Sequence, residues 1–109
     1  MGNRVKFAVA GVSFNKEIVD YLQQKLIEGF NFLVKLEIDE ENQYDENAIK
    51  VLITDKKDNE WVRVGWVPKS INELVKMAIN DNSVNDVRLD YVGNAGYVNN
   101  GVKVSFELT

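Results

Sequence analysis

Six short stretches of this 109-residue chain alternate apolar and polar residues with a period of two. That period places all the apolar side chains of a stretch on one face of an extended strand, which predicts strands with one buried face. In chain order the predicted strands are Val5–Val9, Phe32–Ile38, Asn47–Thr54, Trp61–Val67, Val87–Tyr91 and Val102–Leu108. Such short strands must bury their apolar faces against one another, so the chain is restricted to a small, sheet-based fold.

Two stretches instead repeat their apolar residues every three or four positions, which is the period of a helix. In the first, Asn15 is the expected N-cap and Gly29 the expected C-cap. In the second, Ser70 and Glu73 form a predicted capping box directly after Pro68, the only proline. We therefore expect a mainly β fold with two helices (α+β), one helix between the first two strands and one between the fourth and fifth.

This order of elements is compatible with two architectures. Short amphipathic strands hide their edges best in a small, strongly curved six-stranded β-barrel. The same pattern also allows an open sheet with two helices on one face. The charged stretch 55–60 and the glycine- and asparagine-rich stretch 93–101 are read as connections between strands.

The composition is that of one soluble domain, residues 1–109. Apolar residues make up 45% and charged residues 28%, a balance typical of globular proteins. No apolar run approaches the roughly 20 residues that span a bilayer, and no signal peptide opens the chain. A cytoplasmic protein without membrane contact is the expectation.

The residue types that are missing restrict the chemistry. The chain has neither cysteine nor histidine, which removes disulfides, zinc fingers and imidazole bases. The acidic residues 39–45 lack the glycine and the final glutamate of a calcium loop, so no metal and no cofactor is expected. A net charge of −4 argues against broad electrostatic coating of duplex DNA but leaves room for a small, local nucleic-acid site.

The stretch 42–51 begins as a polar turn and continues as a strand. Its short polar side chains favour a turn, and its apolar residues then follow the two-residue period. Tyr44 and Asp45 are therefore expected at the mouth of a buried strand. An aromatic ring beside a fixed acceptor suits a planar ligand that carries a hydroxyl. The structural alternative is that Asp45 closes an Asx turn while Tyr44 covers the edge of the core.

Three segments of the chain resemble the HIRAN domain family. They are residues 42–51 (N-x-Y-D-x-N-A-I-x-V), 65–68 (G-W-V-P) and 9–14 (V-A-G-V-S-F), and the resemblance runs from about Val5 to the end. It implies a single HIRAN-like domain with a small, OB-like, partly open six-stranded β-barrel.

The resemblance also implies a function, because similar members of that family bind the 3′ end of single-stranded DNA. Asp45 would then accept a hydrogen bond from the terminal 3′-hydroxyl, and Tyr44 would stack on the terminal sugar or base. A carboxylate repels phosphate but accepts from a hydroxyl, which favours a free end. Stacking contributes about 1–3 kcal/mol per base without a preference for one base. The result would be recognition of an end rather than of a sequence.

Four further residues are candidates for this site, each with a structural alternative. Trp66 is a second stacking residue, although its parity on the strand also fits the core. Lys69, before a helix N-terminus, is a phosphate contact or an ordinary solvated lysine. Phe14 stacks on the ligand or forms a hydrophobic staple, and Tyr97 closes over the ligand or packs on its own hairpin. Ser13 departs from an arginine that some DNA-binding relatives carry.

Structural support is expected from Asn47, which bonds the backbone that presents Asp45, and from Gly65 and Pro68.

The expected function is a nucleic-acid-binding module in DNA repair or replication. Its partners would be a single-stranded DNA 3′ end and a helicase-like ATPase or nuclease on another chain, because no phosphate-loop motif is present. The alternative is a protein–protein adaptor with the same fold, which the acidic balance and Ser13 favour. A carboxylate-based nuclease is a third reading; without a partner acid for Asp45, the chain is not expected to be an enzyme.

Overall fold

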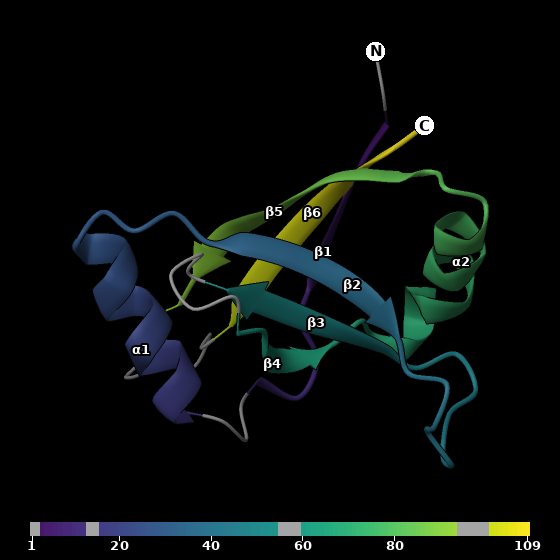
Figure 1. Ribbon diagram of the computed structural model, residues 1–109, viewed down its shortest axis with the longest axis horizontal. Helices are drawn as coiled ribbons and strands as arrows, with labels where there is room; N and C mark the ends of the chain where they lie inside the picture. The colour runs from purple at the N-terminus through teal and green to yellow at the C-terminus, as the bar shows by residue number, and fades with distance from the viewer. Residues whose placement is uncertain (1–2, 13–15, 55–59, 94–100) are drawn as a thin grey trace.

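The computed structural model describes residues 3–12, 16–54, 60–93 and 101–109, and within them the chain is mainly β with two helices. The elements, in order, are β1 (Asn3–Ala8), α1 (Lys16–Ile27), β2 (Leu33–Ile38), β3 (Ile49–Thr54), β4 (Val62–Trp66), α2 (Lys69–Asn80), β5 (Val84–Val92) and β6 (Val102–Leu108) (Figure 1). The expected class and the expected positions of both helices are thus confirmed. No helix among these residues is long and apolar enough to cross a membrane.

The strands form two antiparallel sheets of three strands each, in the orders β1-β6-β5 and β2-β3-β4. An isolated bridge joins the sheets: the N–H of Ala10 donates to the oxygen of Trp66 at 2.8 Å, and the N–H of Trp66 to the oxygen of Ala10 at 2.9 Å. On the other side β2 lies beside β5, but no ladder pairs them in the described part of the chain. The described strands do not close into a barrel, and the six-stranded barrel is not confirmed.

The core lies between the two sheets, with α1 at one end and α2 at the other (Figure 1). In β6 the side chains of Val102, Val104 and Phe106 are buried, as the two-residue period predicts. The Phe106 ring packs against that of Phe7, with ring centroids 6.4 Å apart. Each fully buried side chain of this size contributes about 1.5–3 kcal/mol to stability.

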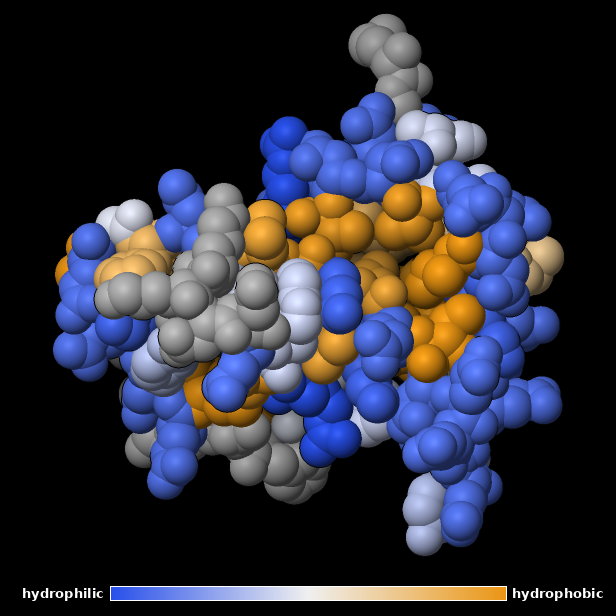
Figure 2. Space-filling model, viewed as in Figure 1, coloured by the Kyte–Doolittle hydropathy of each residue, from blue (hydrophilic) through white to orange (hydrophobic). Residues whose placement is uncertain are grey.

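Apolar surface is visible where the sheets are not joined. Orange side chains lie between β2, β5 and α2 in the space-filling view (Figure 2). Partly buried residues of these elements pack against the core there, among them Leu36, Ile38, Ile79 and Val84. Side-chain packing therefore takes the place of a strand ladder along this side of the fold.

The helix ends differ in how well the sequence predicts them. Gly29 adopts φ of +90°, and the N–H of Phe30 donates to the oxygen of Lys25 at 3.0 Å, so the predicted C-terminal signal of α1 is confirmed. The capping box of Ser70 is wrong. Helix α2 begins at Lys69 with Pro68 as its N-cap, at φ of −58°, and no side chain caps it. The fixed φ of proline starts this helix. Asn15 lies outside the described residues.

Strand β5 begins at Val84, three residues before its predicted start. Asp86 has φ of +50°, and the register shifts between Asn85 and Arg88, which marks a β-bulge. The bulge breaks the alternation before Val87. A second register shift, between Leu89 and Tyr91, leaves Tyr91 exposed while Val92 packs against the core, so the predicted alternation of Tyr91 with Leu89 is wrong. Arg4 of β1 reaches across β6 to the bulge, where it donates to the Asp86 backbone oxygen at 2.8 Å and to the Asp86 carboxylate at 3.1 Å.

Candidate functional site

The turn before β3 is built from side-chain to backbone hydrogen bonds. Asn42 Oδ1 accepts from the N–H groups of Tyr44 and Asp45, both at 2.9 Å. Asp45 Oδ1 in turn accepts from the N–H of Asn47 at 2.9 Å. The N–H of Ala48 donates to the Asp45 backbone oxygen at 3.1 Å. Asp45 therefore closes an Asx turn, as its structural alternative states, and Asn47 contributes its backbone N–H to hold that carboxylate.

Helix α2 holds the same turn from the other side. Asn72 is buried, 4% exposed, and its Nδ2 donates to Asp45 Oδ2 at 2.8 Å. One turn further along α2, Lys76 Nζ donates to the backbone oxygen of Glu46 at 2.7 Å. These two contacts fix the turn against α2 and set the direction of the Asp45 carboxylate.

Asn72 was not among the predicted site residues, although the sequence contains a signal for it. It precedes Val75 by three positions and Ile79 by seven, so it lies on the apolar stripe of α2. A polar side chain on a buried stripe needs a hydrogen-bond partner. The periodicity marks Asn72 as unusual, but only the folded chain supplies the partner, which is 27 positions away.

The Asp45 carboxylate retains capacity to accept further hydrogen bonds. Each of its oxygens takes one of the described bonds, from Asn47 and from Asn72. A carboxylate offers about four acceptor positions, so about two are left. Asp45 is partly exposed and lines two hollows, an apolar one and a polar one. Closing the Asx turn and binding a ligand are therefore compatible for this residue.

The apolar hollow beside Asp45 brings four predicted site residues together. Tyr44, Asp45, Trp66 and Lys69 all line it, and its volume is about 240 Å³. Ala10, Ala48 and Val67 supply apolar surface. The four predicted residues come from three places in the chain: the turn before β3, the end of β4 and the start of α2. The hollow thus combines rings, one acceptor and one cation.

The second, the polar hollow, lies over the first turn of α2. It is an open depression of about 500 Å³, lined by Tyr44, Asp45, Asn47, Lys69, Ser70, Asn72, Glu73 and Leu74. The carboxylates of Asp45 and Glu73 are therefore part of its lining together with the ammonium group of Lys69. No side chain at the N-terminus of α2 accepts a capping hydrogen bond from the N–H groups of its first turn. Such groups favour anions, and the exposed Lys69 adds a positive charge beside them.

The two rings of the site differ in their surroundings. Tyr44 is 95% exposed. Trp66 is half-buried, and the guanidinium carbon of Arg63 lies 4.9 Å from its ring centroid. The core placement suggested by the parity of Trp66 is wrong. A register shift puts Trp66 opposite Lys50 and Arg63 opposite Leu52, so Trp66 leaves the core-facing side.

Gly65 and Pro68 support the position of Trp66 and Lys69. A Cβ at Gly65 would lie 2.3 Å from the backbone oxygen of Ala10, so the bridge between the sheets requires glycine there. Pro68 begins α2 and so places Lys69 in its first turn. Ser13, Phe14 and Tyr97 lie outside the described residues.

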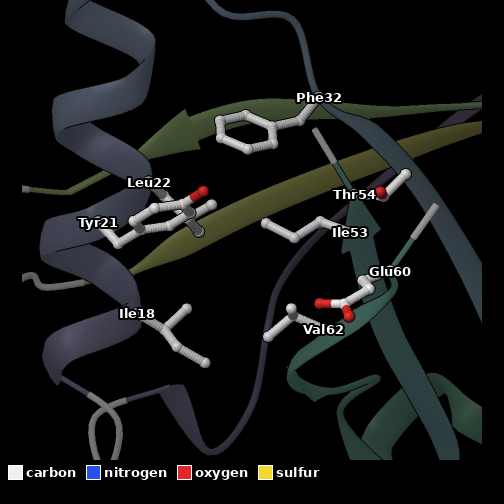
Figure 3. Close-up of a pocket in the computed structure, with 8 residues that line it drawn as sticks. All are labelled: Ile18, Tyr21, Leu22, Phe32, Ile53, Thr54, Glu60 and Val62. Atoms are coloured by element: carbon white, nitrogen blue, oxygen red, sulfur yellow. The ribbon is translucent and has the colours of Figure 1, made fainter. Parts of the chain in front are cut away.

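Another hollow, of about 130 Å³, lies between α1 and the β3–β4 hairpin (Figure 3). Its walls are apolar, with Ile18 and Leu22 from α1 facing Ile53 and Val62. Among the described residues that line it, Glu60 is the charged one. These described walls accommodate small apolar groups. None of the predicted site residues lines it.

The described residues contain no group of three or more acidic side chains placed to share a metal ion. No protein-family model, curated protein or solved structure matches the chain. The described residues form a small α+β fold in which the Asp45 carboxylate, held by Asn47 and Asn72, lines one hollow together with Tyr44, Trp66 and Lys69.

Proposed function

We propose that this domain binds the 3′-hydroxyl end of single-stranded DNA at the apolar hollow. The convergence of Tyr44, Asp45, Trp66 and Lys69 on that one hollow is the observation that carries the proposal. The resemblance to the HIRAN family supports it from the sequence. The antiparallel pairing of β3 and β4 brings the turn before β3 to the end of β4, and so places Tyr44 and Asp45 beside Trp66 and Lys69.

Asp45 is the residue that distinguishes the end of a strand. Its two oxygens are each held by one donor, which fixes the carboxylate before a ligand arrives. A fixed acceptor saves the ordering cost of binding. A terminal hydroxyl donates to such an acceptor, whereas a terminal phosphate is repelled by it.

The rings and the helix terminus provide the remainder of the binding energy. The exposed ring of Tyr44 can stack on a base at a gain of about 1–3 kcal/mol. Trp66 supplies a second ring across the hollow. Lys69 and the first turn of α2 contact the phosphate that precedes the terminal sugar. The result is a site that accepts any sequence and one kind of end.

We also propose that the two sheets form a partly open, OB-like barrel. The Ala10–Trp66 bridge on one side, with β2 beside β5 on the other, supports a partly open, OB-like barrel. A helicase-like ATPase or nuclease on another chain would act on the end that this domain holds, in DNA repair or replication in the cytoplasm.

A protein–protein adaptor is the second candidate, and one observation favours it. Leu74 and Met77 on α2 are 68% and 57% exposed, which leaves apolar side chains free for a partner. An adaptor of this kind binds neither a 3′-hydroxyl nor a 3′-phosphate oligonucleotide.

Fluorescence anisotropy with labelled oligonucleotides separates the two functions. The strands are identical in sequence and carry either a 3′-hydroxyl or a 3′-phosphate. The proposal predicts tighter binding of the hydroxyl end, and a 5′-phosphate should change the affinity little. Equal binding of both 3′ ends refutes the end-recognition function, and no binding of either at low salt favours the adaptor.

A further inference from the structure

The outer face of the β2-β3-β4 sheet carries a basic and aromatic surface next to the apolar hollow. Residues opposite one another on antiparallel strands share a face of the sheet. On the face turned away from the main core cluster, the register places the rows Glu37–Lys50–Trp66 and Lys35–Leu52–Arg63, in which Leu52 is itself buried. We call these two rows, together with Trp61, the outer-sheet surface.

Its charge is opposite to that of the whole chain. The two rows hold the cations Lys35, Lys50 and Arg63 against one carboxylate, Glu37, whereas the chain carries a net charge of −4. Glu37 contacts Lys35 at 3.7 Å and Lys50 at 3.9 Å, and all three side chains are substantially exposed. Exposed pairs at such distances hold their partners weakly. Arg63 has no ion pair among the described residues.

The cations of this surface lie against indole rings. Lys35 Nζ is 4.5 Å from the ring centroid of Trp61, which is 37% exposed, and the guanidinium carbon of Arg63 is 4.9 Å from that of Trp66. Proteins that bind single strands without sequence preference combine cations that follow the backbone with rings on which bases stack. A guanidinium plane also offers a stacking surface to a base.

The outer-sheet surface is continuous with the apolar hollow through Trp66, which belongs to both. Adjacent strands lie about 4.8 Å apart, and successive residues on one face of a strand about 6.7 Å apart. A path from Trp66 across Lys50 and Arg63 to Lys35 therefore spans several nucleotides. A strand whose last residue occupies the hollow can reach this surface without leaving the protein.

We infer that the outer-sheet surface binds the nucleotides that precede the 3′ end of a single strand, with Lys50 and Arg63 contacting its phosphates. The direction of this path rests on the proposed function, in which the hollow holds the 3′ end of the strand. The ligand class is a single-stranded nucleic acid longer than the few nucleotides that the hollow accommodates.

The test compares affinity across oligonucleotide length and salt. The parent, the double variant Lys50→Gln/Arg63→Gln and the single variant Lys50→Gln are titrated with 3′-hydroxyl oligothymidylates of about three and about ten nucleotides. Salt is varied from about 50 to 200 mM. The matched control is Lys6→Gln/Lys103→Gln, which removes two exposed lysines from the outer face of the other sheet. Circular dichroism verifies that each variant is folded.

We expect the double variant to bind the longer strand about tenfold more weakly at low salt and to lose about 1.4 from the slope of log affinity against log salt, or 0.7 for each of two phosphate contacts. Lys50→Gln alone should lose half of that slope. The shorter strand, the ratio between 3′-hydroxyl and 3′-phosphate ends, and the control variant should behave like the parent.

The outcomes separate this inference from the proposed function. If the double variant keeps the parent's affinity and salt slope while the end preference persists, the inference is wrong and the proposed function stands. If the parent shows no end preference but the double variant still loses affinity for the longer strand, the surface is supported and the role of the hollow is wrong. If the parent binds no single strand, or if polyglutamate binds with the same loss in the double variant, the inference is overturned.

Discussion

The amide of Asn72 reaches across 27 positions of sequence to the carboxylate of Asp45, with Nδ2 and Oδ2 2.8 Å apart. Asn72 is buried in the core-facing stripe of α2, whereas Asp45 stands at the edge of two hollows. A buried side chain therefore holds a partly exposed acceptor in place. In the proposed function, this bond makes Asp45 a preformed receptor for a hydroxyl.

Replacement of Asn72 by leucine should reduce both stability and end preference. The volume is nearly kept, but Asp45 Oδ2 loses its donor, which costs about 1–3 kcal/mol of unfolding free energy. Urea denaturation measures that cost, and the 3′-hydroxyl to 3′-phosphate affinity ratio should fall. Asn80→Leu, an exposed position on the same helix, is the control and should change neither quantity. An unchanged ratio in Asn72→Leu would show that Asp45 needs no orientation from α2.

Replacement of Gly65 by alanine tests the junction between the sheets. The new Cβ would lie 2.3 Å from the Ala10 oxygen and 2.7 Å from Cγ1 of Val9, so the bridge must open or shift. We expect a loss of about 2–3 kcal/mol in unfolding free energy. Gly29→Ala is the comparison, because its φ of +90° is unfavourable but its Cβ meets no atom within 4 Å, so the cost there should stay near 1 kcal/mol. Equal losses in the two variants would contradict the role given to the bridge.

Replacement of Tyr44 by alanine should weaken binding without destabilising the fold. The side chain is 95% exposed, so its removal should alter the unfolding free energy by less than about 0.5 kcal/mol. Loss of stacking should lower affinity for both 3′-hydroxyl and 3′-phosphate strands by about 5- to 150-fold, which corresponds to 1–3 kcal/mol. A marked loss of stability would instead assign Tyr44 to the edge of the core.

The bulge in β5 should make stability depend on pH through Asp86. The hydrogen bond from Arg88 lowers the pKa of Asp86 below its ordinary value of 3.8, and the charges of Arg88 and Arg4 act in the same direction. A lowered folded-state pKa contributes stability above the unfolded value, and this contribution is lost as the pH falls below 3.8 through the folded value. Asp86→Asn, which tolerates the positive φ, should be less stable than the parent near neutral pH, with the difference closing in acid.

Urea midpoints of parent and Asp86→Asn over this pH range measure the effect, with Asp90→Asn on the same strand as control. A difference that stays constant from neutral pH into acid would mean that the charge of Asp86 does not stabilise the bulge.

The sequence predicts those features that depend on regular periods. The burial of Val102, Val104 and Phe106 in β6 follows from two-residue alternation, and the C-terminal glycine of α1 follows from local backbone preference; both are found. The alternation does not predict Ser105, which is buried as well. The bulges are not visible in the pattern, because each inserts one residue and reverses the parity that follows. For this reason the parity of Trp66 suggests the core side, which Trp66 does not occupy, and the pattern places the start of β5 at Val87 instead of Val84.

In the candidate site, too, the sequence predicts local features but not contacts between distant residues. The turn around Asp45 is local and can be read from its short polar side chains. The contact from Asn72 and the approach of Ala10 to Trp66 connect distant parts of the chain, and such contacts are set by packing rather than by neighbouring residues. Sequence periodicity identifies a polar residue on a buried stripe but not its partner.

The most direct test of the account is the end preference of Asp45→Asn. This variant keeps the size of the side chain and removes the charge that accepts a hydroxyl and repels a phosphate. The account predicts that the parent prefers the 3′-hydroxyl strand and that Asp45→Asn binds both ends with nearly equal affinity, while Asp90→Asn keeps the parent's preference. If Asp45→Asn discriminates between the two ends as the parent does, the carboxylate does not read the terminus and the proposed function is contradicted.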